Sequence, residues 1–180
     1  MHKVSDKEEG KEYKGKSYLR FSRLLLAELL PCTGEICGRS ICIQHVSFLL
    51  KEIYDRNQFP TGIELYILNH FSSVNIKSGL YHYRYEFNEL EYIDEHPHSD
   101  TLKAAEPLGT LFIFTGKFGE EKQQDILLNV GASSGDIAKK AHTLGYKARR
   151  ITSDSHRNLE DILDIDGVSE SVICAINLGN

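Results

Sequence analysis

A strand-like segment runs directly into the longest predicted helix of the chain within GKFGEEKQQDILLNVGASSGDIAKKAHTLGY, residues 116–146. Apolar residues recur there at spacings of four, seven, four and three, which places them on one face of a helix of about five turns. These residues are Ile126, Val130, Ile137, Ala141 and Leu144. The pattern predicts a helix from Glu121 to Leu144, and Gly145 follows as a residue suited to end it.

The middle of this helix is nearly bare of side chains. Gly131 and Gly135 bracket Ala132, Ser133 and Ser134, and each glycine in a helix interior costs about 1 kcal/mol of helix propensity. We interpret this cost as a sign that a second subunit or a ligand approaches the patch closely.

The other segments predict a sheet with helices on its flanks. Apolar spacing predicts further helices at Leu19–Leu30, Ile43–Tyr54 and Asn158–Leu163. Short β-rich runs predict strands at 63–68, 80–85, 90–93, 111–115 and 171–178. Tyr81, Tyr83 and Tyr85 would share one face of their strand, which we interpret as a covered aromatic face rather than a ligand-stacking one. The predicted fold class is α+β, with a mostly antiparallel sheet flanked by helices.

Length and composition indicate one domain. The chain of 180 residues has the usual size of a single domain. Residues 1–16 are nearly all charged or small, so we expect a disordered charged tail there and a single domain over 17–180. No apolar run is long enough to span a membrane, and the N-terminus lacks the apolar segment of a secretory signal, so we expect a cytoplasmic protein. The formal charge of −5 argues against nucleic acid as a partner.

The cysteines raise the question of a metal site. Cys32, Cys37 and Cys42 are closely spaced and His45 is near them, but the paired C-x2-C spacing of zinc sites and the common iron–sulfur spacings are missing. Cys174 stands alone in an apolar strand. Buried thiols without a ligand are the preferred interpretation, and we predict no metal.

Several stretches resemble one branch of the nitroreductase-fold flavoproteins, the SagB-type dehydrogenases. That branch has a G-L-Y-x-Y-x-P-x-x-H-x-L-E segment similar to GLYHYRYEFNELEYI. Its K-Y-G-x-R-x-Y-R…G-x-x-x-x-N-x-x-L-x-A-x-x-L-G-L helix stays in register with KFGEEKQQDILLNVGASSGDIAKKAHTLGY, and its closing strand resembles ILDIDGVSESVICAINLG. Weaker similarity at GRSI and PTGIELYIL extends the resemblance to about residues 38–179. It implies a nitroreductase-like fold whose long central helix lies at a dimer interface.

The resemblance also implies FMN, bound between two subunits. The family holds the flavin phosphate with arginines, whose planar forks suit that task, and lines the flavin ring with a Pro-Ser-x-Gly segment. The implied cofactor-binding residues are Arg39, Ser40, Pro60, Thr61 and Gly62, with Arg149 and Arg150 as candidates to replace lost phosphate ligands. Cys42 or a neighbour stands where the family has its second arginine, and the ring-lining loop is shorter here. The alternatives are a solvent-facing Arg39 and a plain surface pair at Arg149 and Arg150.

Lys117 is the candidate catalytic residue. The family's azoline oxidases use a Lys-Tyr pair as acid/base groups, because oxidation of the ring removes a proton while hydride leaves for the flavin. Lys117 matches the lysine, whereas Phe118 replaces the tyrosine and keeps its ring without the proton-transferring hydroxyl. Glu121 stands where an arginine is usual, and Gln124 replaces another. The alternative for Lys117 is a solvated lysine at a strand end.

Two functions follow from the resemblance. In one, the chain is an active FMN-dependent oxidoreductase that oxidises thiazoline or oxazoline rings in ribosomally made peptides. In the other, which we favour, it is a degenerate, non-catalytic or scaffolding subunit of a peptide-maturation complex, because a dimeric fold depends on its interface rather than on its site groups. Expected partners are a second copy or a related dehydrogenase subunit, and a precursor peptide with its modifying enzymes, but neither nucleic acid nor a membrane.

Overall fold

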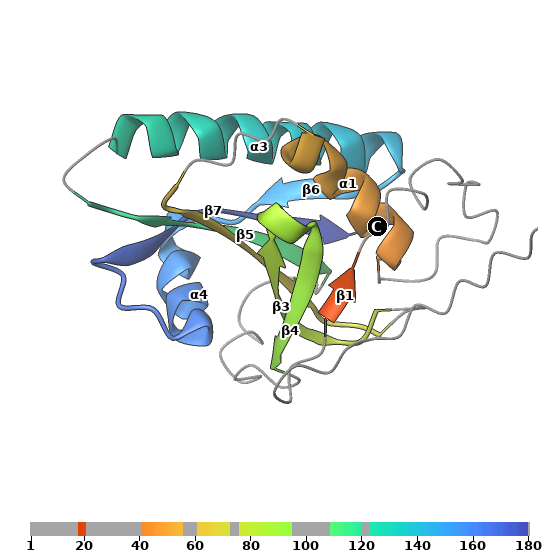
Figure 1. Cartoon of the computed structure of the whole chain (residues 1–180), viewed down its shortest axis with the longest axis horizontal. Helices are drawn as coiled ribbons and strands as arrows, with labels where there is room; N and C mark the ends of the chain where they lie inside the picture. Colours follow the sequence, from red (N-terminus) through yellow and green to blue (C-terminus); the bar gives the residue numbers. More distant parts are fainter. Residues whose placement is uncertain are drawn as a thin grey trace, which may run out of the picture.

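The computed structural model describes residues 18–20, 41–55, 61–72, 76–94, 109–119 and 123–179. Within them, seven strands form one sheet in the order β1-β4-β3-β2-β5-β7-β6, and every neighbouring pair is antiparallel (Figure 1). The strands are β1 (Tyr18–Arg20), β2 (Ile63–Asn69), β3 (Gly79–Arg84), β4 (Glu89–Asp94), β5 (Thr110–Lys117), β6 (Lys147–Arg150) and β7 (Glu170–Gly179). The helices are α1 (Ile43–Asp55), α3 (Gln123–Thr143) and α4 (His156–Leu163), with short 3-10 turns η1 (Tyr85–Phe87) and η2 (Ser153–Ser155). None of the helices in these residues is long and apolar enough to cross a membrane.

The α+β fold with an antiparallel sheet is confirmed, and most predicted elements are present within a few residues of their expected bounds. Tyr85 lies in η1 rather than in β3, because Asn88 takes a left-handed conformation with φ 50° that closes the hairpin. The predicted helix start at Leu19 is wrong: Leu19 and Arg20 pair with β4, whose edge offers backbone partners. The rest of that predicted helix and the predicted tail at 1–16 lie outside the described residues.

The sequence analysis does not predict strand β6. Its residues, KARR, are mostly charged and exposed, so no apolar alternation marks them as a strand. The strand forms because it pairs with β7, and Ala148 packs against the main core. Pairing with a neighbour, rather than local propensity, creates this element.

One side of the sheet, called the α1–α3 side below, is covered by those two helices (Figure 1). Successive strand residues point to opposite faces, so β2 and β5 each contribute alternate apolar residues to it: Ile63, Leu65, Ile67, Phe112 and Phe114. The apolar stripe of α3 is buried against them as predicted, at Ile126, Val130, Ile137 and Ala141, while Leu144 is half-buried. Tyr81 and Tyr83 are buried in the same core, which confirms the covered aromatic face.

The opposite side, called the α4 side, is covered by α4 over part of its area (Figure 1). Leu159 and Ile162 of α4 pack there against a smaller core that includes Ile113, Val172 and Ala175. Further along the sheet, the residues on this side become polar, at Glu64 of β2 and at His82 and Arg84 of β3. The α4 side therefore combines a small apolar core with a polar surface.

Candidate functional site

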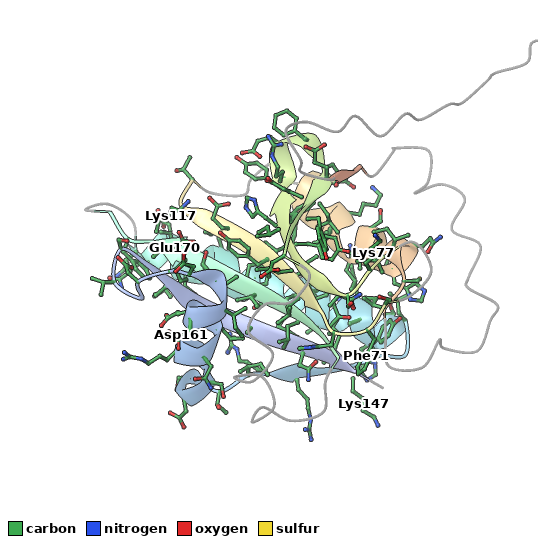
Figure 2. The ribbon with its side chains drawn as sticks, turned by 90° about the horizontal axis from the view of Figure 1, so that it is seen from below. Phe71, Lys77, Lys117, Lys147, Asp161 and Glu170 are labelled. Atoms are coloured by element: carbon green, nitrogen blue, oxygen red, sulfur yellow. The ribbon has the colours of Figure 1, made fainter. Side chains whose placement is uncertain are left out.

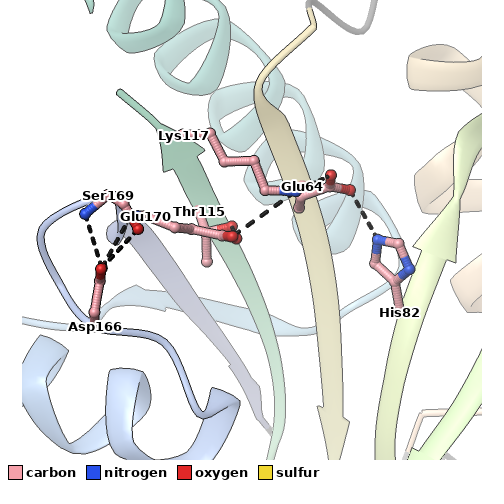
Figure 3. A network of polar contacts seen from close by, with 7 residues as sticks. All are labelled: Glu64, His82, Thr115, Lys117, Asp166, Ser169 and Glu170. Atoms are coloured by element: carbon pink, nitrogen blue, oxygen red, sulfur yellow. Dashed lines mark hydrogen bonds and ion pairs between the residues drawn. The ribbon is translucent and has the colours of Figure 1, made fainter. Parts of the chain in front are cut away.

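A row of charged side chains crosses the α4 side of the sheet near the end of β5 (Figure 3). It consists of Glu170 of β7, Lys117 of β5, Glu64 of β2, His82 of β3 and Glu91 of β4, and is called the polar row below. Neighbouring members come from neighbouring strands, so the register of the sheet brings them together. Acidic and basic groups alternate along the row.

Glu64 lies at the centre of the polar row. One carboxylate oxygen accepts a hydrogen bond from Lys117 Nζ at 2.9 Å, and the other lies 2.8 Å from His82 Nε2. The pKa of Glu64 is lowered to about 2: the hydrogen bond with His82 is the largest cause, burial opposes it, and Lys117 adds to the lowering. Glu64 is therefore an anion throughout the neutral range and fixes the positions of both neighbours.

Lys117 is held between two carboxylates. Its Nζ lies 2.9 Å from Glu64 and 3.8 Å from an oxygen of Glu170. The hydrogen bond to Glu64 raises the pKa of Lys117, and burial offsets this effect in part. A general base must be deprotonated near the working pH, so in this arrangement the amine can donate a proton but is poorly suited to accept one.

Glu170 is positioned by its own hydrogen bonds. Thr115 Oγ1, fully buried, donates to its carboxylate at 2.5 Å. In the preceding loop, Asp166 Oδ1 accepts the backbone N–H groups of Val168, Ser169 and Glu170 at 2.8, 2.8 and 3.2 Å, and its other oxygen accepts the Ser169 hydroxyl at 2.7 Å. These bonds lower the pKa of Asp166 to about 2. The loop entering β7 is therefore fixed by one carboxylate (Figure 3).

Tyr66 lies beside the polar row on β2. Its ring centroid is 5.0 Å from that of His82, with the two planes tilted by 32°. Burial and the nearby charges of Glu170, Glu64 and Glu91 raise the pKa of the Tyr66 phenol. The phenol thus stays protonated at neutral pH and can donate, not accept, a proton.

Among the predicted site residues, the structure brings Gly62 and Lys117 together. The backbone N–H of Lys117 donates to the Gly62 carbonyl at 2.7 Å. Gly62 has φ +92°, and a Cβ there would lie 3.3 Å from the Lys117 carbonyl oxygen, so both backbone shape and space favour glycine. Thr61 is exposed in the same turn as Gly62. Phe118, which follows Lys117 in the sequence, is half-buried. These residues form one corner at the end of the sheet.

Arg149 and Arg150 lie elsewhere. Arg150 pairs with Ile176 of β7, which pairs with Phe112 of β5, five residues before Lys117. Strand geometry then separates the Cα atoms of Arg150 and Lys117 by roughly 20 Å. Figure 2 shows Lys117 and Glu170 at one end of the molecule and Lys147 of β6 at the other. Within one subunit, the two arginines do not share a site with Lys117; Arg39, Ser40 and Pro60 lie outside the described residues.

Gly131 and Gly135 are exposed on the outer face of α3. A Cβ added at either position would meet no described atom within 4 Å. The fold of the described chain therefore does not require them, and the bare patch faces outward beside Ala132 and the 71% exposed Leu128.

The sequence analysis missed four members of the polar row: Glu64, His82, Glu91 and Glu170. A signal was available for two of them, because Glu64 and His82 are polar residues between apolar or aromatic neighbours in the runs IELYIL and LYHYRY. A charged residue inside an apolar strand indicates a partner across the sheet. No such signal identifies which residue that partner is.

The described residues contain no group of three or more His, Cys, Asp or Glu side chains that could hold a metal ion. Cys42 is half-buried and Cys174 is buried, and neither forms a disulfide with another described residue. Cys32 and Cys37 lie outside the described part of the chain.

Three solved structures share this fold. A protein of Anabaena variabilis assigned as a nitroreductase has a TM-score of 0.54 and 22% identity over 65% of this chain and 27% of its own. A chain of the Escherichia coli microcin synthetase McbBCD complex, solved with truncated pro-MccB17 bound, has a TM-score of 0.61 and 15% identity over 79% of this chain and 64% of its own. A Ralstonia eutropha protein assigned as a nitroreductase has a TM-score of 0.55 and 16% identity over 90% of this chain and 84% of its own.

These matches show a nitroreductase-like α+β fold, because their identities of 15–22% support similarity of fold and no more. The chain spans 27% and 64% of the lengths of the first two proteins. No protein-family model and no curated protein matches the sequence.

Proposed function

We propose that this chain is a nitroreductase-fold subunit of a complex that matures ribosomally made peptides, and that it acts there as a non-catalytic or scaffolding subunit. Support for the setting comes from the microcin synthetase complex, one chain of which gives the largest TM-score of the three structures, 0.61, and was solved with a truncated pro-peptide bound. The sequence resemblance to SagB-type dehydrogenases points to the same setting.

One observation carries the non-catalytic part of the proposal: the amine of Lys117 is bound between Glu64 and Glu170. A base that removes a proton from an azoline ring needs an available lone pair. The pKa of Lys117 is raised, so the amine is charged at neutral pH. Phe118, next in the chain, has no hydroxyl to take over the transfer.

The described residues also fit FMN poorly. FMN supplies a hydride acceptor when bound, and its phosphate needs cationic partners. At the Gly62–Lys117 corner, Glu64 and Glu170 already compensate the positive charge of Lys117, and the same carboxylates would repel a phosphate. Arg149 and Arg150 lie at the other end of the sheet.

The outer face of α3 is the proposed interface with a second subunit. Leu128, Gly131, Ala132 and Gly135 are exposed and recur at helical spacing. Small residues let a facing helix approach closely, and the exposed leucine supplies apolar surface. The partner would be a second copy or a related dehydrogenase subunit.

The alternative is an active FMN-dependent oxidoreductase acting on thiazoline or oxazoline rings or another small substrate. The convergence of Gly62 and Lys117 at one corner favours it, since both match positions of the family's flavin site. In that case the phosphate ligands would come from Arg39 and Ser40 or from a second subunit.

The first experiment is a flavin titration. We expect the purified protein to be colourless and to leave FMN fluorescence unquenched at micromolar concentrations, because its described candidate residues offer no suitable phosphate site. A yellow protein, or quenching by stoichiometric binding, would overturn the non-catalytic proposal and support the oxidoreductase.

A second experiment tests the acid/base group directly. Phe118→Tyr restores the missing hydroxyl but leaves Lys117 bound to Glu64, so we expect no oxidation of a thiazoline-containing peptide in the presence of FMN. The double variant Phe118→Tyr with Glu64→Gln releases the amine as well. Turnover by the single variant would contradict the argument from Lys117. Turnover by the double variant alone would support that argument but would contradict the poor fit to FMN.

A further inference from the structure

The sheet ends at β6. Among the described residues this strand has one neighbour, β7, and it stands last in the strand order. An edge strand presents unpaired backbone groups along its open side and can accept an additional strand. The open edge of β6 is therefore a place where an extended peptide could bind.

The register shows which backbone groups face outward. Ile151 N–H donates to the Ala175 carbonyl at 2.9 Å, which makes this a hydrogen-bonded pair. Hydrogen-bonded and non-hydrogen-bonded pairs alternate in an antiparallel ladder, so Arg149 faces β7 as well, while Ala148 and Arg150 direct their N–H and C=O groups away from it. The edge thus offers two donors and two acceptors at the spacing of a strand.

The side chains along this edge are strongly basic. Lys147, Arg149 and Arg150 are exposed, with Arg150 on the face of Ala148 and the other two on the α4 side. Residues 147–157 contain four lysines or arginines and one acidic residue, although the chain as a whole has a formal charge of −5. Positive charge is thus concentrated on the segment that contains the edge.

This positive charge determines which kind of strand could pair with the edge of β6. Two β6 strands paired edge to edge would bring arginines and lysines against each other, and like charges on facing strands are destabilising. A second copy is therefore disfavoured at this edge. An acidic strand would gain main-chain hydrogen bonds together with opposite-charge pairs on both faces.

We infer that the open edge of β6 binds an extended acidic peptide segment as an eighth strand, with Ala148 and Arg150 forming its main-chain hydrogen bonds. The inference rests on the sheet order and register, and it holds independently of the function proposed above.

Fluorescence anisotropy with the full chain tests it. The probe is a fluorescein-labelled peptide of alternating Glu and Thr, about eight residues long, and the comparison is the same peptide with Lys in place of Glu. We expect the acidic peptide to bind and the basic peptide not to bind. Ala148→Pro removes an outward N–H, which an edge strand tolerates, and should weaken binding about tenfold. Ala148→Ser keeps that N–H and should bind like the wild type.

A charge control separates edge binding from general attraction. Arg149→Glu with Arg150→Glu should abolish binding, whereas Lys139→Glu alters an exposed charge on α3 rather than on β6 and should leave binding within about twofold. Equal loss in Lys139→Glu, or unchanged binding in Ala148→Pro, would show that the charges do no more than attract anions or deter self-association, and would overturn the inference.

Hydrogen exchange gives a reading that does not depend on a variant folding. In the wild type, the amides of Ala148 and Arg150 should exchange more slowly when the acidic peptide is added, while the Arg149 amide, already bonded to β7, should not change. Unchanged exchange at Ala148 and Arg150 under saturating peptide would overturn the inference.

Discussion

The two sides of the sheet are built on different principles. On the α1–α3 side, apolar side chains of strands and helices interlock, with Phe112 and Phe114 fully buried. On the α4 side, a helix of eight residues covers part of the area and the polar row crosses another part. One face is stabilised by burial and the other by paired charges at a half-exposed surface.

This contrast between the two sides indicates where amino-acid substitutions are tolerated. Packing against two helices leaves little room for altered volume on the α1–α3 side. The α4 side depends on the register that places Glu64 between Lys117 and His82, and its paired charges respond to pH and to single substitutions.

Phe112→Ala should have the largest effect. It empties a fully buried position on the α1–α3 side, so we expect the free energy of unfolding to fall by about 3–5 kcal/mol. Urea denaturation measures it. Val168→Ala is the control, because Val168 is 80% exposed and the change should alter the free energy by less than about 0.5 kcal/mol. Similar losses in the two variants would contradict the comparison between core and surface.

Glu64→Gln should have the next largest effect, on the α4 side. The pKa of Glu64 is about 2 in the folded protein and 4.5 ordinarily, so its stabilisation is complete above pH 4.5 and is lost as the pH falls towards 2. We expect a loss of about 2 kcal/mol at pH 7 after allowance for solvent screening. Lys117 contributes less to this figure because its side chain is 53% exposed.

Urea denaturation at several pH values measures this prediction. The wild type should lose stability between pH 4.5 and 2, and Glu64→Gln should remove the part of that dependence due to this carboxylate. Glu86→Gln, at an exposed position in η1, is the control and should leave the dependence intact. An identical pH dependence in wild type and Glu64→Gln would rule out the central role of Glu64.

Thr115→Val should have a smaller effect. It keeps the side-chain volume but removes the hydrogen bond to Glu170, which should cost about 1 kcal/mol in the free energy of unfolding. Thermal and urea denaturation measure it. Thr152→Val, at an exposed position before η2, is the matched control and should be neutral. A neutral Thr115→Val would mean that Glu170 holds its place without this bond.

Gly131→Leu should have the smallest effect on the subunit itself. The position is open to the outside, so better helix propensity should raise the free energy of unfolding by about 0.5–1 kcal/mol. The same change should disrupt self-association through α3, measured as mass by light scattering. Gly119→Leu is the control, since a Cβ there also meets no described atom within 4 Å. An oligomer retained in Gly131→Leu would exclude the bare patch as the interface.

Local periodicity predicted the α1–α3 side well. The stripe from Ile126 to Ala141 could be recognised because residues on one helical face repeat every three or four positions, whatever they contact. The strand at 147–150 could not be recognised, because its charged residues become a strand through pairing with β7. The strand predicted to end at Tyr85 ends one residue earlier, at Arg84, because η1 and the left-handed Asn88 close the hairpin.

The candidate site was predicted in part. Lys117 was selected from the resemblance, and Gly62 is its neighbour in the structure, but the carboxylates that hold Lys117 were not foreseen. Glu64 and Glu170 lie 53 residues before and 53 residues after it in the sequence. Their proximity depends on strand order and register, which no local pattern encodes.

The sequence by itself determined the α+β class, the long helix with its bare middle, and the identity of the residue at the end of β5. The tertiary structure decided what that residue can do, because the pKa of an amine depends on the charges that surround it in space. It also decided that Arg149 and Arg150 form a basic edge remote from Lys117, since antiparallel pairing with β7 fixes their distance along the sheet.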